Sequence, residues 1–327
     1  MLIYAIRRTL QAIPLMIIIS IVIFAILEKM PGGPLAPYLQ NPHITAADIK
    51  RLEHNFGLDQ PKPVQYWRWV SHYVSGDWGW SNSQSEPVTT AMFSRLSATL
   101  KLTVSALVLA LVVGLAFGII AAVKPYSPVD YFVTTLAFFG QSMPVFWFAI
   151  LMQFWLAVGG IHLQAFGYRF DFSLPSAGLT STEGGGFVDQ VRHLVMPVIV
   201  LSLLQVATFS RFTRASMQEV LHTDYMRTAA AKGLSFGNII LKHGLKNALM
   251  PVVTIVALTM PSLVGGAVVT ETIFAYPGMG RLFITALNQQ DFPLLQGYLV
   301  VLAVLVVMFN LLADLAYGWL DPRIRYD

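Results

Sequence analysis

The sequence is dominated by long stretches that contain no charged residue. Six of them run for 18 residues or more without Asp, Glu, Lys or Arg and with little Pro/Gly punctuation. They cover residues 9–27, 102–123, 131–168, 193–210, 247–270 and 292–313. A helix needs roughly 20 residues to cross a hydrocarbon core of about 30 Å, so each stretch can span a membrane. The sequence therefore predicts an all-α membrane protein with six transmembrane helices.

Composition supports this class of protein. Of the 327 residues, 55% are hydrophobic and only 12% are charged, whereas soluble domains carry about 25% charged residues. A seventh uncharged run, 30–47, is rich in Pro and Gly and is expected to be a loop. The first span has the basic start of a signal peptide but is followed by Glu28 and Lys29 instead of a small-residue cleavage site, so we expect it to be retained. Cysteine is absent, which excludes disulfides and thiol chemistry.

The basic residues predict the orientation of the chain. With the N-terminus inside, the cytoplasmic segments hold Arg7, Arg8, Lys124, Arg211, Arg214, Arg227, Lys232, Lys242, Lys246, Arg323 and Arg325, and the two shorter outside loops hold only Arg169, Arg192 and Arg281. This asymmetry follows the positive-inside rule. It predicts a cytoplasmic N-terminus (1–8), a first span at 9–27 and a cytoplasmic tail (321–327). The net charge of +4 then reflects topology, and nucleic acid is not expected as a partner.

The loop 28–96 is expected to lie outside and to contain helices. Thr45 and Asp48 have the spacing of a capping box, and Gly57 can end the helix that they begin. A second helix is expected to end at Gly76, with a tryptophan-rich sequence typical of a membrane interface. The loop can be a lid packed on the bundle or a platform for an outside partner.

Several polar residues lie within the predicted spans. Polar groups at this depth usually face the bundle or a water-filled cavity, so they can form interhelical hydrogen bonds or line a polar passage. The candidates for a passage lining are Gln141, Ser142, Gln153, Ser202, Gln205, Thr208, Thr259 and Ser262. Gly114 and Gly118 form a small-xxx-small pair that allows close helix packing.

Motifs for an independent active site are missing from the sequence. There is no phosphate-binding GxxxxGK[ST] loop, no HExxH zinc pair and no GxSxG nucleophile elbow. The seven histidines are scattered without metal-ligand spacing, so no metal site and no catalytic residue are expected.

The largest hydrophilic segment on the predicted inner side is 211–247. Thr223 or Asp224 can cap a helix through its alanine run, and Gly233 suits the left-handed residue that ends it. Ser235 can cap a second helix that runs toward Pro251. A helix–turn–helix of this size exceeds what a connection between spans requires, so it is suited to docking into a groove of another protein.

The segment "YMRTAAAKGLS" resembles the coupling segment of permease subunits from ATP-binding-cassette importers. The chain is similar, end to end, to the first permease of the dipeptide/oligopeptide/nickel branch. The motifs that carry this resemblance are "MPGGP", "FGLDQPKPVQYWRWV", "GDWGWS", "SMPVFW", "HLVMP", "ETIFAYPGMGRLF", "DFPLLQG" and "DLAYGWLDPRIR", in the expected order. Arg227, Thr228 and Ala229 stand where the general importer signature has Glu-Ala-Ala before Gly233, a departure usual for this branch.

The resemblance implies the type I ABC importer permease fold, with a permease core at 97–320 and a helical extracytoplasmic loop between helices 1 and 2. It implies that the chain lies in a bacterial or archaeal plasma membrane and contacts ATPases through Tyr225, Arg227, Thr228, Ala229, Lys232, Gly233, Leu234 and Ser235. It also implies a heterodimer with a second homologous permease, two cytoplasmic ATP-binding subunits that hold ATP and Mg, and an extracytoplasmic substrate-binding protein. No cofactor is implied for this chain.

Other functions remain open at this point. Within the same importer class the cargo can be di-/oligopeptides, nickel, glutathione or an oligosaccharide. Outside that class, a stand-alone secondary transporter or channel would need intramembrane ion sites or an internal inverted repeat, which the sequence does not show. An intramembrane enzyme would need paired acids or a Ser/His pair within the spans. An exporter half usually carries its nucleotide-binding domain on the same chain.

Overall fold

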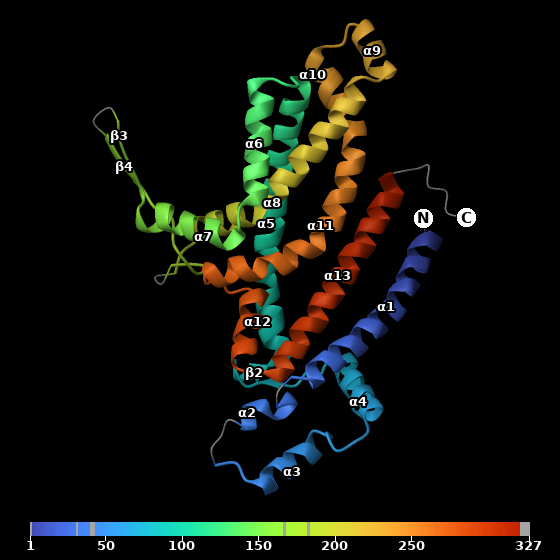
Figure 1. Cartoon of the computed structure of the whole chain (residues 1–327), viewed down its shortest axis with the longest axis vertical. Coiled ribbons are helices and arrows are strands. Elements are labelled where there is room, and N and C mark those ends of the chain that lie inside the picture. The colour runs from blue at the N-terminus through green and yellow to red at the C-terminus, as the bar shows by residue number, and fades with distance from the viewer. Residues whose placement is uncertain (1, 31, 40–42, 166–167, 182–183, 321–327) are drawn as a thin grey trace. The chain divides into compact units, whose positions relative to one another are not determined.

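The computed structural model describes residues 2–30, 32–39, 43–165, 168–181 and 184–320, most of them helical (Figure 1). The chain divides into two compact units, which are treated separately below. The first unit contains Leu100–Tyr276 and the chain from Leu312 onward. The second unit contains Leu2–Thr99 and Pro277–Leu311.

The first unit is built around one long helix, α8, which packs against α6 and α11. Its helices are the later part of α5 (Val88–Val123), α6 (Pro128–Ser142), α7 (Val145–Gln153), α8 (Phe187–Leu221), α9 (Asp224–Ala231), α10 (Phe236–Asn238) and α11 (Leu245–Ile273). A Cβ atom on Gly118 of α5 would lie 2.5 Å from the Cβ atom of Thr213 and 2.7 Å from the carbonyl oxygen of Ser210. The predicted close helix approach at this glycine is therefore confirmed, because a side chain would not fit there.

The third predicted span, 131–168, is not one continuous helix. Its helices α6 and α7 meet at an angle of 102°. Met143, which precedes Pro144, has extended backbone angles (φ −76°, ψ 123°), as expected because proline disfavours helical geometry in the preceding residue. After α7 the chain passes through a π-helical turn (Phe154–Val158).

A β-hairpin replaces the last part of that predicted span. Strand β3 (Ile161–Ala165) pairs antiparallel with β4 (Tyr168–Phe172), in a register that sets Ile161 opposite Phe172. Gly160, with φ of 63°, ends the preceding helical segment in a conformation that favours glycine. The described chain is mostly helical, as predicted, but it also contains this hairpin. Absence of charge indicates compatibility with lipid and does not distinguish helix from strand.

The second unit combines long helices with short ones. Its elements are α1 (Leu2–Glu28), a 3₁₀ turn (Gly33–Leu35), α2 (Ala36–Leu39), α3 (Ala46–Asn55), α4 (Lys62–Ser75), the paired strands β1 (Trp80–Ser81) and β2 (Glu86–Pro87), the start of α5, α12 (Met279–Asn288) and most of α13 (Phe292–Leu320). The predicted capping box is present, because Thr45 and Asp48 each accept a hydrogen bond from the other's backbone NH. Gly57 (φ 67°) follows α3 and Gly76 (φ 87°) ends α4, as predicted.

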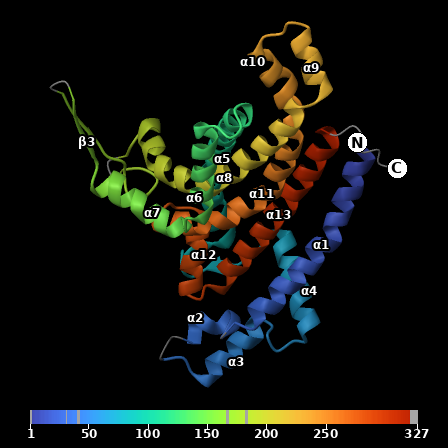
Figure 2. The same cartoon turned by 45° about the horizontal axis from the view of Figure 1, so that its top comes forward.

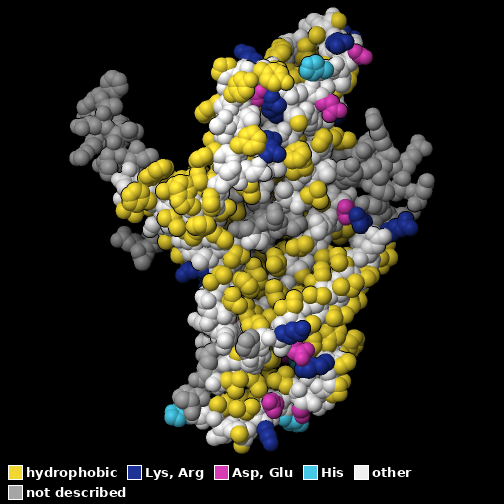
Figure 3. All heavy atoms as spheres, in the orientation of Figure 1, with side chains coloured by type: hydrophobic (Ala, Val, Ile, Leu, Met, Phe, Trp, Pro, Cys, Tyr) yellow, Lys and Arg dark blue, Asp and Glu magenta, His cyan; other side chains and the backbone are white. Residues whose placement is uncertain are grey.

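The long apolar helices agree with a multi-pass membrane protein. Within the described residues, five helices are long and apolar enough to cross a membrane, and the bent pair α6–α7 would make a sixth span. In the first unit, α9 and α10 lie beyond the ends of α8 and α11 in both views of the chain (Figures 1 and 2). Charged side chains gather at this end, whereas hydrophobic side chains cover α7 (Figure 3).

Candidate functional site

The segment predicted to dock on a partner forms a compact helical tip. Helix α8 continues to Leu221, so the first residues of the predicted 211–247 segment belong to this long helix. His222 and Thr223 connect it to α9, which runs from Asp224 to Ala231. The tip is thus joined to α8, a helix of 35 residues, by a connection of only two residues.

The start of α9 differs from the predicted cap. Thr223 is the N-cap residue, but its hydroxyl donates to the carbonyl oxygen of Val220 at 2.6 Å and makes no cap hydrogen bond to α9. Asp224 lies in the first turn, where its negative charge favours the positive end of the helix dipole. Thr223 therefore fastens the connection to α8 instead of satisfying the first amide groups of α9.

Two residues on the inner side of α9 anchor the tip. Met226 and Ala229 are the buried residues of this helix, three positions apart on one face. The Cε atom of Met226 would lie 3.2 Å from a Cβ atom on Gly244, so the methionine occupies the space left by this glycine. Met217 packs next to them in a cluster with Ile240. This packing attaches one face of α9 to the residues beneath it.

The turn after α9 agrees with the prediction, and the second helix is longer than predicted. Gly233 has φ of 74°, the left-handed conformation that ends a helix. From Ser235 the chain enters α10, passes through a π-helical turn (Ile239–Gly244) and continues in α11 to Ile273. Pro251 lies inside this helix. π-helical turns are rare in proteins, and those that occur are often found at functional sites. This one joins the tip directly to α11.

The outer side of the tip is exposed and partly apolar. Tyr225 is 42% exposed, Leu234 40% and Phe236 65%. Arg227 and Lys232 are also exposed and place positive charge beside these side chains. An exposed mixture of aromatic, aliphatic and arginine side chains is typical of a protein interface.

The predicted contact residues divide between the two sides of the tip. Tyr225, Arg227, Thr228, Lys232, Gly233, Leu234 and Ser235 are exposed, whereas Ala229 is 7% exposed and packs inward. Phe236, which the sequence analysis did not single out, is the most exposed large apolar side chain of the tip. Phe236 directly follows Ser235, which is the N-cap residue of α10 but, contrary to the prediction, makes no side-chain cap hydrogen bond.

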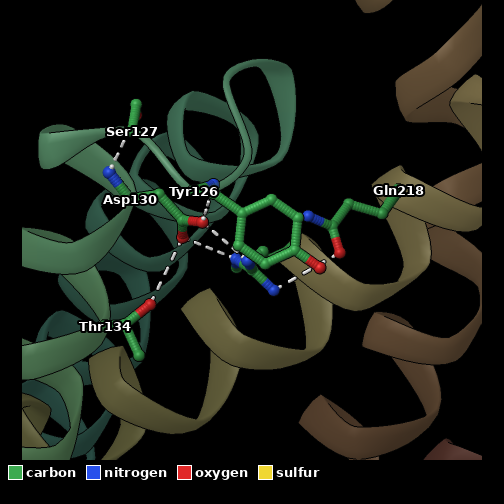
Figure 4. A network of polar contacts seen from close by, with 6 residues as sticks. Tyr126, Ser127, Asp130, Thr134 and Gln218 are labelled. Carbon is green, nitrogen blue, oxygen red and sulfur yellow. Dashed lines mark hydrogen bonds and ion pairs between the residues drawn. The ribbon is translucent and has the colours of Figure 1, made fainter.

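An ion pair between a buried Asp130 and a partly exposed Arg214 holds α6 on α8 two turns before α8 ends. The guanidinium of Arg214 donates to both carboxylate oxygens of Asp130, each at 2.6 Å. Figure 4 shows that Tyr126 and Thr134 also approach this carboxylate, the first through its backbone NH at 2.8 Å and the second through its hydroxyl at 3.3 Å. The Asp130 side chain is 3% exposed. Bidentate pairs of this kind fix both partners in orientation, so α6 is tied to the helix that carries the tip.

The sequence analysis missed this pair, although a signal for half of it was present. Ser127, Pro128 and Asp130 have the spacing of a helix start, and the Ser127 hydroxyl accepts the backbone NH of Asp130 at 3.2 Å. Arg214 was considered only for the charge balance between loops. Nothing in the sequence alone connects positions 130 and 214.

Most of the residues proposed to line a passage make hydrogen bonds within this chain, and their role in a passage stays a prediction. Gln153 donates to the carbonyl oxygens of Ser176 at 2.8 Å and Ile273 at 3.1 Å, and Gln141 accepts from Arg211. Ser202 lines a cavity of about 290 Å³ among α5, α6 and α8 whose lining is otherwise apolar apart from Ser210.

The hydroxyls of Ser202, Thr208 and Thr259 donate to carbonyl oxygens of their own helices. Gln205 is buried and Ser142 is exposed at the end of α6. The side chain of Ser262 lies outside the described ones. Among the residues that the structure describes, no group of three or more His, Asp or Glu is placed to hold a metal ion.

The sequence profile described as "Binding-protein-dependent transport system inner membrane component" matches residues 114–326. A second profile, for the N-terminal part of such membrane components, matches residues 1–105. The chain belongs to the binding-protein-dependent transport family. This match confirms the resemblance to importer permeases. Together with the long apolar helices, it identifies the chain as a multi-pass inner-membrane component.

Curated members of the binding-protein-dependent transport family are similar over their whole length. The "Oligopeptide transport system permease protein AppB" of Bacillus subtilis is 40% identical over 326 residues, which is 99% of each chain. The "Dipeptide transport system permease protein DppB" of Escherichia coli K12 is 38% identical over 340 residues, covering 100% of this chain and 99% of the relative.

A solved structure supports the fold. A chain from the structure described as "Inward facing conformations of the MetNI methionine ABC transporter" matches with a TM-score of 0.53 at 18% identity. The match covers 72% of this chain and 99% of the other. At this identity the match concerns the fold alone, and it agrees with the predicted type I importer permease fold.

Proposed function

We propose that this chain is the permease subunit of an ATP-driven importer and forms, with a paralogous permease, the pathway for di-/oligopeptides delivered by an extracytoplasmic binding protein. The observation that carries the proposal is end-to-end similarity to two permeases whose names specify oligopeptide and dipeptide transport. The helical tip also supports the proposal, because its exposed, partly apolar surface is suited to binding a separate ATPase subunit.

The proposed topology has six spans with both termini in the cytoplasm. The loop 28–96 lies outside, the core 97–320 contains spans two to six, and 211–247 includes the coupling segment on the inner side. The positive-inside distribution of Lys and Arg supports this arrangement. The pair α6–α7 then serves as the third span in two bent halves.

The proposed assembly contains two cytoplasmic ATP-binding subunits, one of them seated on α9 and α10. ATP and Mg bind in those subunits, and this chain itself contributes no catalytic residue. Closure of the ATPases would push the tip, and Met226 and the buried contacts beneath it would transmit the displacement to α8 and α11. The Asp130–Arg214 pair would carry the movement on to α6.

Substitutions in the tip test the coupling role. Gly233→Val forces a branched side chain into a left-handed backbone conformation, and Arg227→Glu reverses an exposed charge. Both variants should insert into the membrane normally but lose most transport-coupled ATP hydrolysis in the assembled complex. Gly186→Val is the matched control, because Gly186 precedes α8 outside the tip, has nothing within 4 Å of its Cβ position and has no positive φ. Unimpaired uptake by both tip variants would contradict the assignment of the tip.

Uptake measurements test the cargo. Proteoliposomes containing the whole complex and its binding protein should accumulate labelled di- or oligopeptides only when ATP is supplied. Nickel, glutathione and an oligosaccharide serve as alternative cargoes in parallel samples. Accumulation of one of these instead of peptides would refute the peptide assignment but keep the importer class. Transport by the isolated chain without ATPases would refute the importer class itself.

A further inference from the structure

The second unit contains a small cavity whose lining carries two arginines. Its volume is about 240 Å³, and it lies between the beginning of α5 and the beginning of α12. The lining consists of Gln84, Arg95, Pro277, Gly278, Arg281, Leu282 and Thr285. None of these lining residues is acidic, and the two arginines supply the charged groups of the lining.

A buried hydrogen bond fixes the two arginine-bearing helices against each other. The backbone NH of Met279 donates to the Thr99 hydroxyl at 2.8 Å, with both residues almost completely buried. Arg95 lies one turn before Thr99 on the same face of α5, and Arg281 follows Met279 by two residues. The backbone positions of both arginines are therefore set in advance of any binding.

A buried carboxylate, that of Asp291, fixes the turn between β1 and β2, which forms the third side of the cavity. Asp291, at 0% exposure, accepts the Ser81 hydroxyl at 2.6 Å and the backbone NH of Ser83 at 2.8 Å. These bonds hold the turn between β1 and β2, which contributes Gln84 to the cavity. Asp291 also accepts the backbone NH of Leu294 in the first turn of α13 at 3.3 Å. The cavity is thus built by three elements that are locked together by buried polar contacts.

The chemistry of the lining selects a carboxylate. Arg95 is half-buried, and the structure gives its side chain no hydrogen bond or ion pair within the described part of the chain. A guanidinium offers a planar fork of donors that matches the two oxygens of a carboxylate, and charge-assisted pairs of this kind are about twice as strong as neutral hydrogen bonds. The Gln84 amide can complete the contacts with its second NH, since the first donates to the Ser83 carbonyl oxygen at 3.3 Å. The Thr285 hydroxyl already donates to the Arg281 carbonyl oxygen at 3.0 Å.

The size of the cavity selects the source of that carboxylate. Pockets for small molecules typically have about 300–1,000 Å³, so a space of about 240 Å³ is small for a peptide but fits one acidic side chain. In the orientation proposed above, the start of α5 and the whole of α12 face outward. We propose that this cavity, which we call the arginine pocket, anchors an Asp or Glu side chain of the extracytoplasmic binding protein. This inference rests on the proposed function.

The test measures how much binding protein the assembled transporter needs. ATP hydrolysis by the complex in nanodiscs is titrated with peptide-loaded binding protein, and the half-stimulating concentration is determined. The double variant Arg95→Gln/Arg281→Gln should raise this concentration roughly tenfold or more, since truncating one side of a desolvated charge pair weakens association strongly. Arg51→Gln is the matched control, because it removes the same charge from an exposed position on α3 and should leave the titration unchanged.

Salt and a conservative variant separate a carboxylate fork from general attraction. Arg95→Lys keeps the charge but loses the planar fork, so its half-stimulating concentration should lie between those of the wild type and Arg95→Gln. For the wild type, the half-stimulating concentration should rise with salt more steeply than for the double variant. Equal titrations for the wild type and the double variant would overturn the inference. The inference would also be overturned if the double variant needed more peptide but the same concentration of binding protein for half-maximal stimulation, since the carboxylate would then come from the cargo.

A second measurement leaves both arginines intact and covers the case in which the double variant does not assemble. Benzoyl-phenylalanine in place of Thr285 should cross-link the binding protein on illumination, and the captured peptide should contain an Asp or Glu. Capture of a segment without an acidic residue, or no capture while ATP hydrolysis is stimulated, would refute the pocket assignment alone. Absence of any stimulation by a binding protein in the wild type would refute the proposed function, and the inference with it.

Discussion

The tip formed by α9 and α10 and the pair α3–α4 are both short hydrophilic helical segments inserted between long apolar helices, yet they are stabilised differently. Helix α9 has no side-chain cap but buries Met226 and Ala229. Helix α3 has a complete capping box, and neither α3 nor α4 contains a buried residue. The tip is therefore held from one side by packing, whereas α3 and α4 depend on their ends and on surface contacts.

The contacts of α4 are largely aromatic. Tyr73 stacks on Trp78 with ring centroids 5.2 Å apart and lies 5.0 Å from Trp69. The Trp78 ring NH also donates to the carbonyl oxygen of Tyr73 at 3.1 Å. The two kinds of support suit the two proposed tasks. The tip, which is proposed to transmit force from an ATPase, needs a firm base. The pair α3–α4, in which α4 has a tryptophan-rich sequence typical of a membrane interface, needs side chains compatible with that interface. Each of the following substitutions removes one of the two kinds of support.

Met226→Ala should have the largest effect, because it removes the main anchor of the tip. Loss of a buried methionine side chain costs about 2–5 kcal/mol, and Met226 is 4% exposed. Hydrogen exchange of the α9 amides should accelerate strongly, while the amides of α3 remain unchanged. Lys232→Ala is the matched control, since the Lys232 side chain is exposed at the end of α9 and its loss should change local stability by less than about 0.5 kcal/mol. Equal exchange rates in both variants would contradict the one-sided anchoring.

Valine at the two helix-ending glycines should have the next largest effect. Gly233 (φ 74°) and Gly76 (φ 87°) have nothing within 4 Å of their Cβ positions, so the cost arises from backbone conformation alone. A left-handed conformation costs a residue with a Cβ about 1–2 kcal/mol, and a branched side chain is among the worst suited. Gly233→Val and Gly76→Val should therefore destabilise their segments to a similar extent, as measured by limited proteolysis.

Coupling should nevertheless separate these two variants. Gly233→Val should abolish stimulated ATP hydrolysis in the complex, whereas Gly76→Val should retain it. Asparagine tolerates the left-handed conformation better than valine, so Gly233→Asn should recover part of the activity. Loss of ATP hydrolysis in both valine variants would show that the two segments are not specialised in the way proposed.

Removal of one hydroxyl from the aromatic contacts of α4 should be stabilising. The Tyr73 hydroxyl and the neighbouring Trp69 ring NH are both buried, and their geometry does not make a hydrogen bond between them or to another group in the part of the chain that the structure describes. Burial raises the pKa of the Tyr73 phenol. An unsatisfied buried hydroxyl is unfavourable, so Tyr73→Phe should raise the free energy of unfolding by about 1 kcal/mol. Thermal unfolding in nanodiscs provides the measurement. Tyr66→Phe is the control and should be destabilising, because the Tyr66 hydroxyl lies 2.8 Å from that of Ser20.

The features that the sequence predicted correctly are those with local causes. Helix ends at Thr45, Gly76 and Gly233 follow from side-chain capping and from the left-handed backbone of glycine, which depend on a few adjacent residues. The helix approach at Gly118 was also readable from spacing. The tip residues were named from the family resemblance, which did not distinguish the inward-facing Ala229 from the exposed residues around it.

The features that the sequence missed depend on distant residues or on choices that composition does not specify. Asp130 and Arg214 are 84 positions apart, and neither carries a local sign of the other. The uncharged run 131–168 indicated lipid compatibility, but the bend before Pro144 and the hairpin after Gly160 divide it into helices and strands. The arginine pocket likewise joins Arg95 to Arg281, which only the folded second unit brings together.

The smallest expected effect concerns the capping box of α3 and is best seen in its pH dependence. The hydrogen bonds from Thr45, first the side-chain one and then the backbone one, lower the pKa of Asp48 below its ordinary value of 3.8. Because the folded-state pKa is the lower one, this contribution to stability is complete above about pH 4 and is lost as the pH falls through the folded-state pKa of Asp48. Thr45→Ala should therefore raise the pKa of Asp48 toward 3.8 and make the stability of α3 less dependent on acid.

Carboxyl ¹³C NMR of the protein in nanodiscs follows this titration directly. Asp59 serves as an internal reference, because a hydrogen bond with the His54 ring lowers its pKa and Thr45 makes no contribution there. Thr45→Ser keeps the hydroxyl and should preserve the low pKa of Asp48. An unchanged Asp48 titration in Thr45→Ala would show that α3 is held by contacts other than its ends. The contrast between a segment stabilised by capping and a tip stabilised by packing would then no longer hold.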